Sequence, residues 1–288
     1  MQEQVLMPAW RESTNVWHYR AVERVITLMY DRYEEDLGLS QMADTAIISP
    51  YHFNRVFRRI TGIPPVQFLG AIRLEMAKRL LLTTRQSVID VCFQVGYNSL
   101  GTFTRRFTQL VGLSPCRLRR LEREINLPEL KSHVSFASER LDKASAVSGV
   151  TGLVNAPANF SGPIFIGLFS TPIPQGHPVG CTVAMGSGPF HISPVADGYY
   201  YPFAVAYPWT ERPVDYLLSQ EALRGIANPR ALFVRNGQAA GGVNLILRKA
   251  KLIDPPILAA LPFLLAEKKL ALALEDLNQK EALGVEPV

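Results

Sequence analysis

A degenerate repeat constrains the fold of this chain more than any other feature of its sequence. The motif Phe-x-Arg-x-Phe begins at Phe53 and again at Phe103, and each copy leads to a glycine and, three residues later, a proline. Aromatic residues four positions apart indicate the buried face of an amphipathic helix. One basic amphipathic helix is more often just a solvated surface, but a repeated unit is far more specific.

Each copy follows a short apolar segment, at residues 39–46 and 88–95, that we predict to be helical. Between the second pair of helices, Gly96 can end the first one in a left-handed conformation, and Ser99 can cap the next. Before the first copy, Ser49 and Pro50 form a typical helix start. The sequence therefore predicts two helix-turn-helix units. Their second helices have an aromatic inner face and a Thr/Arg outer face, which suits a DNA major groove.

Residues 17–123 resemble the DNA-binding domain of the AraC/XylS family of bacterial transcription regulators. The residues that carry the resemblance are Ser49 to Gly62, Arg73, Ala77, Leu80, Leu81, Gly96 to Ser99, Phe103 to Phe107 and Gly112 to Pro115. At Ile47 the family usually has glycine, so we expect this turn to be built differently. The resemblance implies a sequence-specific transcription regulator whose partners are double-stranded DNA and RNA polymerase. It leaves open whether the protein is an activator or a repressor.

The positions that match the family's DNA contacts form the predicted binding site. They are Tyr51, Asn54 and Arg55 in the first unit, and Leu100, Gly101, Thr102, Thr104, Arg105 and Thr108 in the second. Arginine can donate two hydrogen bonds to guanine, so Arg55 and Arg105 are the best-placed direct readers. A predicted helix over residues 66–82 would be the rigid spacer between the units. Reading two successive major grooves requires a separation of about 34 Å, which corresponds to a site of roughly 20 base pairs.

The positive charge lies on the repeat-bearing half. Residues 1–124 contain 17 Lys and Arg against 12 Asp and Glu, a net charge of +5, whereas residues 125–288 contain 13 of each. This asymmetry is expected where a surface meets DNA phosphates. No segment resembles a signal peptide or a membrane span, so we expect a cytoplasmic protein. The three cysteines suggest neither a disulfide framework nor a zinc site, and we expect no cofactor.

The second half has a different pattern, so the predicted fold class is α + β multidomain. After a linker at residues 124–146, short apolar runs at residues 150–154, 163–169, 179–183, 189–192, 199–206, 231–234 and 243–247 predict an antiparallel β-sandwich over residues 147–249. Residues 188–205, where Asp197-Gly198 leads into a Tyr-rich strand, resemble the hairpin of transthyretin-like and carboxypeptidase-regulatory-like sandwich domains. Residues 250–288 are predicted to form a C-terminal helix and tail, which either covers the sandwich or forms a homodimer seam.

Three roles for the second domain stay open. An enzyme is the least favoured, because the candidate groups show no metal-ligand or nucleophile spacing. These groups are His177, Cys181, His191, Asp197 and Asp215. The aromatic residues between Tyr199 and Trp209 can stack on a small-molecule effector or belong to the core. Alternatively, the domain is only an oligomerisation or protein-interaction module, and the chain is an architectural DNA-binding protein.

Overall fold

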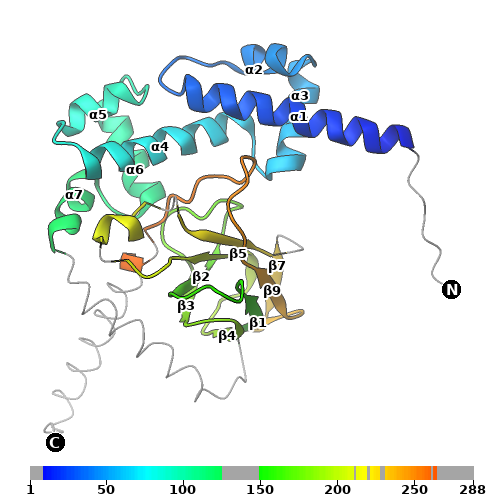
Figure 1. Cartoon of the computed structure of the whole chain (residues 1–288), viewed down its shortest axis with the longest axis vertical. Coiled ribbons are helices and arrows are strands. Elements are labelled where there is room, and N and C mark those ends of the chain that lie inside the picture. Colours follow the sequence, from blue (N-terminus) through cyan, green and yellow to red (C-terminus); the bar gives the residue numbers. More distant parts are fainter. Residues whose placement is uncertain are drawn as a thin grey trace, which may run out of the picture. The chain divides into compact units, whose positions relative to one another are not determined.

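The computed structural model describes residues 9–124, 149–210, 212–218, 221–227, 231–260 and 262–264. This part of the chain is helical up to residue 124 and rich in strands from residue 149 (Figure 1). The chain divides into two compact units. One unit covers residues 1–103 and 251–256, and the other covers residues 104–250 and 257–288. The predicted linker lies almost entirely outside the described residues, so the predicted domain limits at residues 123 and 147 stay a prediction.

Seven α-helices lie between residues 9 and 124. They are α1 (Ala9–Asp31), α2 (Leu39–Ala46), α3 (Pro50–Thr61), α4 (Pro65–Thr83), α5 (Val88–Gln94), α6 (Leu100–Val111) and α7 (Pro115–Glu124). The first helix begins at Ala9 and not at Trp17, where its apolar series starts. The predicted spacer helix is α4, whose Phe68, Ile72 and Ala77 are fully buried.

The repeat seen in the sequence is also a repeat of local structure. Both α3 and α6 have 12 residues, and each follows a serine whose carbonyl accepts the N–H of Phe53 or Phe103. Their phenylalanines, Phe53 and Phe57 in α3 and Phe103 and Phe107 in α6, are fully buried. Both helices end at a glycine with positive φ, 93° at Gly62 and 91° at Gly112. Two helix-turn-helix units are therefore confirmed, with helices and C-terminal glycines of matching design. At the start of the helices only the second serine caps with its side chain: Ser99 Oγ accepts the N–H of Thr102 at 3.4 Å, whereas the Ser49 side chain makes no cap bond.

The turn after α2 was expected to be built differently from the family's usual turn, because Ile47 stands where the family usually has glycine. At its first residue this expectation is wrong, since Ile47 takes the conformation that is typical of glycine. Ile47 takes a left-handed conformation with φ 60°, and its N–H donates to the carbonyl of Asp44 at 3.0 Å. The N–H of Ile48 reaches back to the carbonyl of Ala43 at 3.2 Å. These two bonds form the Schellman motif, which usually has glycine at the left-handed position. Ile47 fits because its side chain is 75% exposed.

Gly96 ends α5 with the same pair of bonds. Its φ is 80°, its N–H donates to the carbonyl of Phe93 at 3.0 Å, and the next N–H, of Tyr97, donates to the carbonyl of Cys92 at 3.1 Å. Here glycine is required for a second reason, because a Cβ atom would lie 2.7 Å from the carbonyl oxygen of Glu34. The same cap therefore tolerates a side chain at one turn and excludes it at the other.

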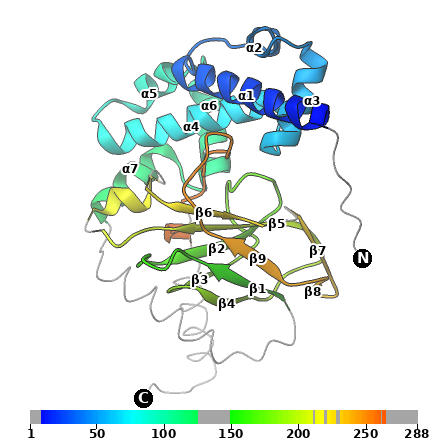
Figure 2. The same cartoon turned by 45° about the vertical axis from the view of Figure 1, so that its right-hand side comes forward.

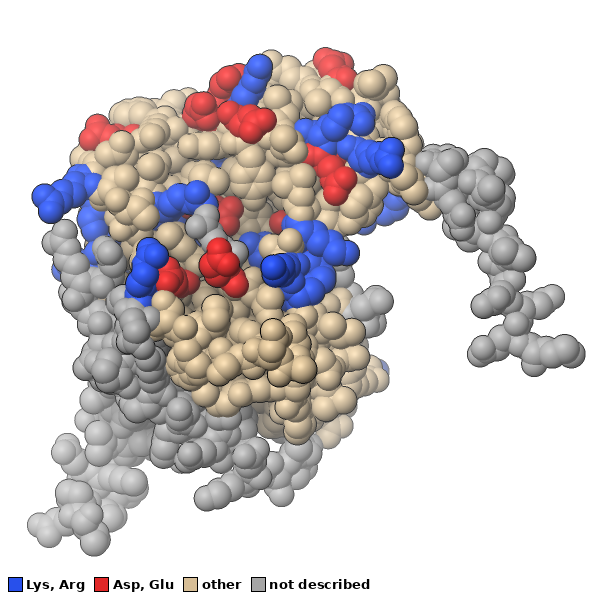
Figure 3. Space-filling view, in the orientation of Figure 1, with Lys and Arg blue, Asp and Glu red and all other residues tan. Residues whose placement is uncertain are grey.

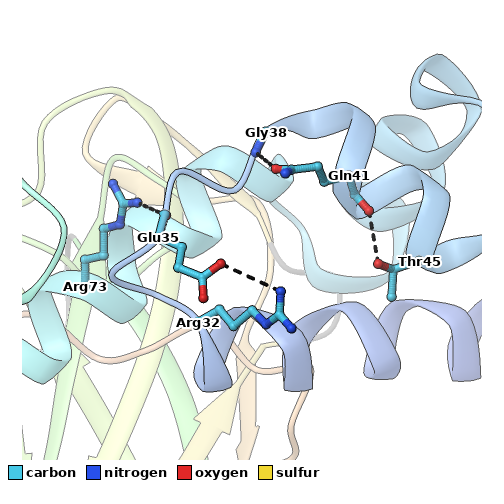
Figure 4. Close-up of polar contacts among 6 residues, drawn as sticks. All are labelled: Arg32, Glu35, Gly38, Gln41, Thr45 and Arg73. Carbon is cyan, nitrogen blue, oxygen red and sulfur yellow. Dashed lines mark hydrogen bonds and ion pairs between the residues drawn. The ribbon is translucent and has the colours of Figure 1, made fainter.

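The loop between α1 and α2 is held by polar contacts from both sides (Figure 4). Arg73 of α4 donates from Nε to the carbonyl of Tyr33 and from Nη2 to the carbonyl of Glu35, both at 2.7 Å. On the other side, Gln41 Oε1 accepts the N–H of Gly38 at 2.9 Å. Arg73, one of the landmarks of the family resemblance, thus positions the backbone ahead of the first helix-turn-helix unit.

Nine strands form two sheets in the described part of the β-rich region (Figure 2). They are β1 (Val150–Asn155), β2 (Ile164–Phe169), β3 (Gly180–Ala184), β4 (Gly188–Ile192), β5 (Gly198–Ala206), β6 (Leu223–Ile226), β7 (Leu232–Arg235), β8 (Gln238–Ala239) and β9 (Val243–Ile246). The smaller sheet has the order β4-β1-β9. The larger has the order β3-β2-β5-β7-β8, with β6 also paired to β5. Apolar residues of both sheets share one core, which includes Val154, Ile166 and Leu245.

All seven predicted strands are present, but two features of the predicted sandwich are wrong. First, β4 and β5 do not form a hairpin, because β4 pairs with β1 and β5 pairs with β2, β6 and β7. Second, β1 and β9 pair in parallel, so the region is not purely antiparallel. The hairpin on which the likeness to transthyretin-like domains was based is therefore absent. The likeness itself stays a prediction.

The predicted C-terminal helix falls mostly outside the described residues. Residues 251–260 contain no helix, and residues 262–264 are helical. Residues 257–260 are buried although they lack regular structure.

Candidate nucleic-acid interface

The outer face of α3 carries the first group of predicted readers. Tyr51 is 81% exposed, and Asn54 and Arg55 are exposed as well. Their neighbours Phe53 and Phe57 are fully buried. Because the helix turns 100° per residue, burying these aromatic residues fixes which side chains face outward.

The outer face of α6 carries the second group. Gly101, Thr102, Arg105 and Thr108 are exposed, as is Leu100 at 39%. Thr104 is half-buried, and its carbonyl accepts a hydrogen bond from the hydroxyl of Thr108 at 2.8 Å. A threonine hydroxyl engaged inside its own helix leaves mainly its methyl group for a DNA contact. The structure thus exposes every predicted reader of α6 except Thr104, while their contacts with DNA stay a prediction.

Further arginines of the helical region are exposed. Arg58 and Arg59 of α3, Arg106 of α6 and Arg120 of α7 are exposed. Figure 3 shows basic and acidic side chains interspersed over the helical region, while much of the β-rich region on the same face is uncharged. The ion pair between Arg32 and Glu35 is long, at 3.7 Å, and both side chains are more than half exposed. Such a pair contributes little to stability.

A pair of histidines that the sequence did not reveal lies between α1 and α3. Nε2 of His52 on α3 lies 3.3 Å from Nε2 of His18 on α1. Burial, followed by the nearby charges of Arg59 and His52, lowers the pKa of His18. The two histidines are 34 positions apart. No local pattern could have indicated that they meet.

The candidate groups of the β-rich region stand on separate elements. Cys181 lies on β3, His191 on β4 and Asp215 in a short 3-10 helix at Pro213–Tyr216. Asp197 accepts the N–H of Gly237 at 3.0 Å. Within the described ranges, no group of three or more His, Cys, Asp or Glu residues is arranged to hold a metal ion.

The aromatic residues suggested as ligand-stacking groups are mainly part of the core. Tyr200, Phe203 and Tyr207 are at most 8% exposed. Tyr199 and Trp209 are exposed, at 69% and 37%, and the ring of Tyr199 lies 4.7 Å from that of Phe233. Among the described helices, none has the length and apolar character needed to cross a membrane.

Comparison with known proteins identifies the helical region. Residues 42–121 match the family described as a helix-turn-helix domain. The chain is 32% identical over 100 residues to the bifunctional transcriptional activator/DNA repair enzyme AdaA of Bacillus subtilis, covering 34% of this chain and 47% of that protein. It is 34% identical over 82 residues to an HTH-type transcriptional regulator of Mycobacterium tuberculosis, covering 28% and 32% of the two chains. The matched region is thus less than half of each relative.

A solved structure resembles the same region. The DNA-binding domain of AdpA in complex with a target DNA shares 30% identity, covers 36% of this chain and 93% of that one, and has a TM-score of 0.35. The family match and the repeated helices with their buried aromatic faces point to the same region. Residues 42–121 of this chain are a helix-turn-helix DNA-binding domain of the AraC family.

Proposed function

We propose that this chain is a sequence-specific transcription regulator that reads two successive major grooves of DNA with α3 and α6. The observation that carries this proposal is the matching design of the two helices. Each buries its aromatic face and exposes an arginine at the same position, Arg55 or Arg105. A helix of this kind can present arginine to guanine while its ends contact phosphate.

The proposed readers differ between the two helices. In α3, Asn54 offers an amide that matches the edge of adenine, and Tyr51 lies beside it. In α6, Leu100 and Gly101 offer only apolar contact or a close approach of the backbone, with Thr102, Thr104 and Thr108 nearby. A Cβ atom on Gly101 would meet nothing closer than 4.0 Å. The space beside Gly101 is therefore open. Because the proposed readers differ between the two helices, the two half-sites should differ in base sequence.

The test is selection of genomic DNA fragments by the full-length protein, followed by binding measurements at several salt concentrations. We expect a small set of sites with two short blocks about one helical turn apart. Binding of all sequences alike, with only a steep salt dependence, would contradict sequence-specific reading and favour an architectural role.

Two arginines of α6 provide a matched pair for the reading mechanism. Arg105→Ala should weaken binding to the selected site by roughly 1–3 kcal/mol and relax the preference at one base pair. Arg106→Ala removes the same charge from the neighbouring exposed position, so it should weaken binding to all sequences about equally. If Arg105→Ala also weakened all sequences equally, Arg105 would be a phosphate contact.

We also propose that the β-rich region regulates DNA binding through α6. The second compact unit contains residues 104–111 of this helix together with the strands. The last carbonyls of α6 lack partners within the helix. Loops of the β-rich region supply them: the N–H of Gly176 donates to the carbonyl of Leu110 at 2.6 Å, and that of Ala260 to the carbonyl of Val111 at 3.3 Å. A shift of these loops would therefore act on the end of a reading helix.

A pair of glycine variants tests this coupling. Gly176 has φ 64°, and a Cβ atom there would lie 2.8 Å from the carbonyl oxygen of Gln109. Gly176→Val should therefore push the loop off α6 and weaken binding to the selected site about tenfold, within the usual range of coupling energies. Gly186→Val is the control, because a Cβ atom at Gly186 meets nothing within 4 Å. Equal affinities for the two folded variants would contradict coupling through this contact.

A cavity supports a small-molecule effector as the signal. It has a volume of about 270 Å³ and is lined by apolar side chains, including Pro202, Leu232 and Phe233, and by Gly241 and Gly242. A cavity of this size suits a small, mainly apolar molecule. Ligands found by thermal shift should lose their effect in Ala231→Phe, which places a ring in the cavity. Ligands that stabilise this variant equally would place the effector site elsewhere.

The proposed role is regulatory and not enzymatic. AdaA is named as bifunctional, but the match to it covers 34% of this chain. The family match ends at residue 121, ahead of the β-rich region.

A further inference from the structure

Four polar side chains form a row where α1 meets α3. Arg55 Nη2 lies 3.2 Å from Nδ1 of His52. On its other side, His52 Nε2 lies 3.3 Å from Nε2 of His18, and Nδ1 of His18 lies 3.5 Å from Nη2 of Arg59. His18 is 9% exposed, whereas both arginines are exposed. Two imidazoles thus connect Arg55, a proposed base reader, with an arginine one turn further along the same helix.

Counting hydrogens shows that this row cannot be fully bonded. Arginine only donates, so an Nδ1 atom that bonds an arginine must carry no hydrogen. If both arginines were bonded, each neutral imidazole would carry its hydrogen on Nε2. The two Nε2 atoms, 3.3 Å apart, would then face each other with a hydrogen on each and no acceptor between them. The neutral histidine pair can therefore hold one arginine at a time.

Each of the two allowed arrangements has a distinct tautomer. When Arg55 is held, His52 carries its hydrogen on Nε2 and donates it to His18, whose own hydrogen on Nδ1 excludes Arg59. When Arg59 is held, both hydrogens change position and Arg55 is released. The shorter contact, 3.2 Å against 3.5 Å, favours the arrangement that holds Arg55.

The surroundings keep His18 neutral. Its pKa is lowered by burial first, then by the charges of Arg59 and His52. The charged groups from α3 that face the pair are the two arginines, and α1 contributes the Trp17 ring, whose centroid is 5.4 Å from that of His18. A second positive charge in this row would be repelled by its neighbours.

We propose that His18 and His52 are positioning residues for DNA reading, which hold either Arg55 or Arg59 but not both. This inference rests on the proposed role of α3. In free protein the pair orders Arg55, which reduces the rotamer freedom that this side chain loses on contact with DNA. Arg55 can keep this contact through Nη2 while its other N–H groups reach a base. When Arg55 breaks the contact, the hydrogens shift and His18 takes hold of Arg59. Base reading by one arginine is thereby coupled to the position of the other.

The first test needs no DNA. Nitrogen NMR of the full-length protein, labelled at its five histidines, distinguishes protonated from bare ring nitrogens. The spectra are recorded at least one unit above the usual histidine pKa of about 6.5. We expect His52 to carry hydrogen on Nε2 and His18 on Nδ1. Arg55→Met should move the hydrogen of His52 to Nδ1, whereas Arg59→Met, the matched control, should leave it on Nε2. An unchanged tautomer in Arg55→Met would overturn the proposal, as would a doubly protonated His18.

The second test measures the ratio of affinities for the selected site and for random DNA. His18→Phe keeps a ring but can neither donate nor accept, so the ratio should fall about fivefold, the effect of freeing one long side chain. His18→Gln can do both and should restore the ratio, because an amide can pass on the same hydrogen bond. An unchanged ratio in His18→Phe would overturn the positioning role. If the wild-type protein showed no preference for the selected site over random DNA, the proposed function would fail. The NMR experiment would still decide whether the histidine pair holds one arginine at a time.

Discussion

The left-handed isoleucine at the end of α2 leads to a quantitative prediction. Ile47 has φ 60° in a cap that normally contains glycine. An L-residue in this conformation costs about 1–2 kcal/mol, because its Cβ approaches the following carbonyl oxygen. Glycine avoids this contact but loses about 0.4–1 kcal/mol more backbone entropy on folding.

The two terms predict an order of stability for small residues at this position. Ile47→Gly and Ile47→Ala both remove a side chain that is 75% exposed, so little burial is lost and the loss is nearly equal. The difference between the variants isolates the backbone. We expect Ile47→Gly to be more stable than Ile47→Ala by about 1 kcal/mol.

Ile89 is the matched control. It is also an exposed isoleucine, at 46%, but it lies within α5, where the backbone is right-handed. There the order should invert, and Ile89→Ala should be more stable than Ile89→Gly by roughly 0.5–1 kcal/mol. The assay is urea unfolding of the full-length variants, followed by far-UV circular dichroism of the helices. The reasoning is refuted if alanine is as stable as glycine at position 47.

Three further predictions concern stability. Ser87→Ala should destabilise α5 by about 1 kcal/mol, because Ser87 Oγ accepts the N–H of Asp90 at 3.1 Å in a capping box; undiminished hydrogen-exchange protection of α5 would contradict this. Thr61→Val should lower the free energy of unfolding by about 1–3 kcal/mol, because the buried hydroxyl donates to the Phe57 carbonyl at 2.9 Å. Thr61→Ser, which keeps the hydroxyl, is the control in thermal unfolding. An equal loss of stability in both variants would assign the effect to packing. Burial raises the pKa of Tyr207, so its contribution to stability is complete below about pH 10 and is lost as the pH rises above that value. Tyr207→Phe should flatten this loss, and parallel pH curves for the two proteins would show that Tyr207 is not its source.

The sequence alone predicted the two helix-turn-helix units, seven of the nine strands in the described residues, and which faces of α3 and α6 are buried. Aromatic residues at helical spacing, a serine before each helix and a glycine after it are local signals, because capping and left-handed turns involve neighbouring residues only. For the same reason the seven predicted strands occur at the predicted places, with limits that differ by at most one residue. The strands that were missed, β6 and β8, are short and carry little alternation.

Only the tertiary structure decided which of these elements meet. The partners of β4 and β5, the parallel pairing of β1 with β9 and the row of His18 with His52 depend on chain segments far apart in sequence. Ile47 and Gly96 make the same point within one motif. Their caps are alike, but a side chain fits at the exposed turn and is excluded where Gly96 packs against the backbone of Glu34. Local sequence sets the conformation of a segment, whereas the space around it is set by whatever the rest of the chain packs there.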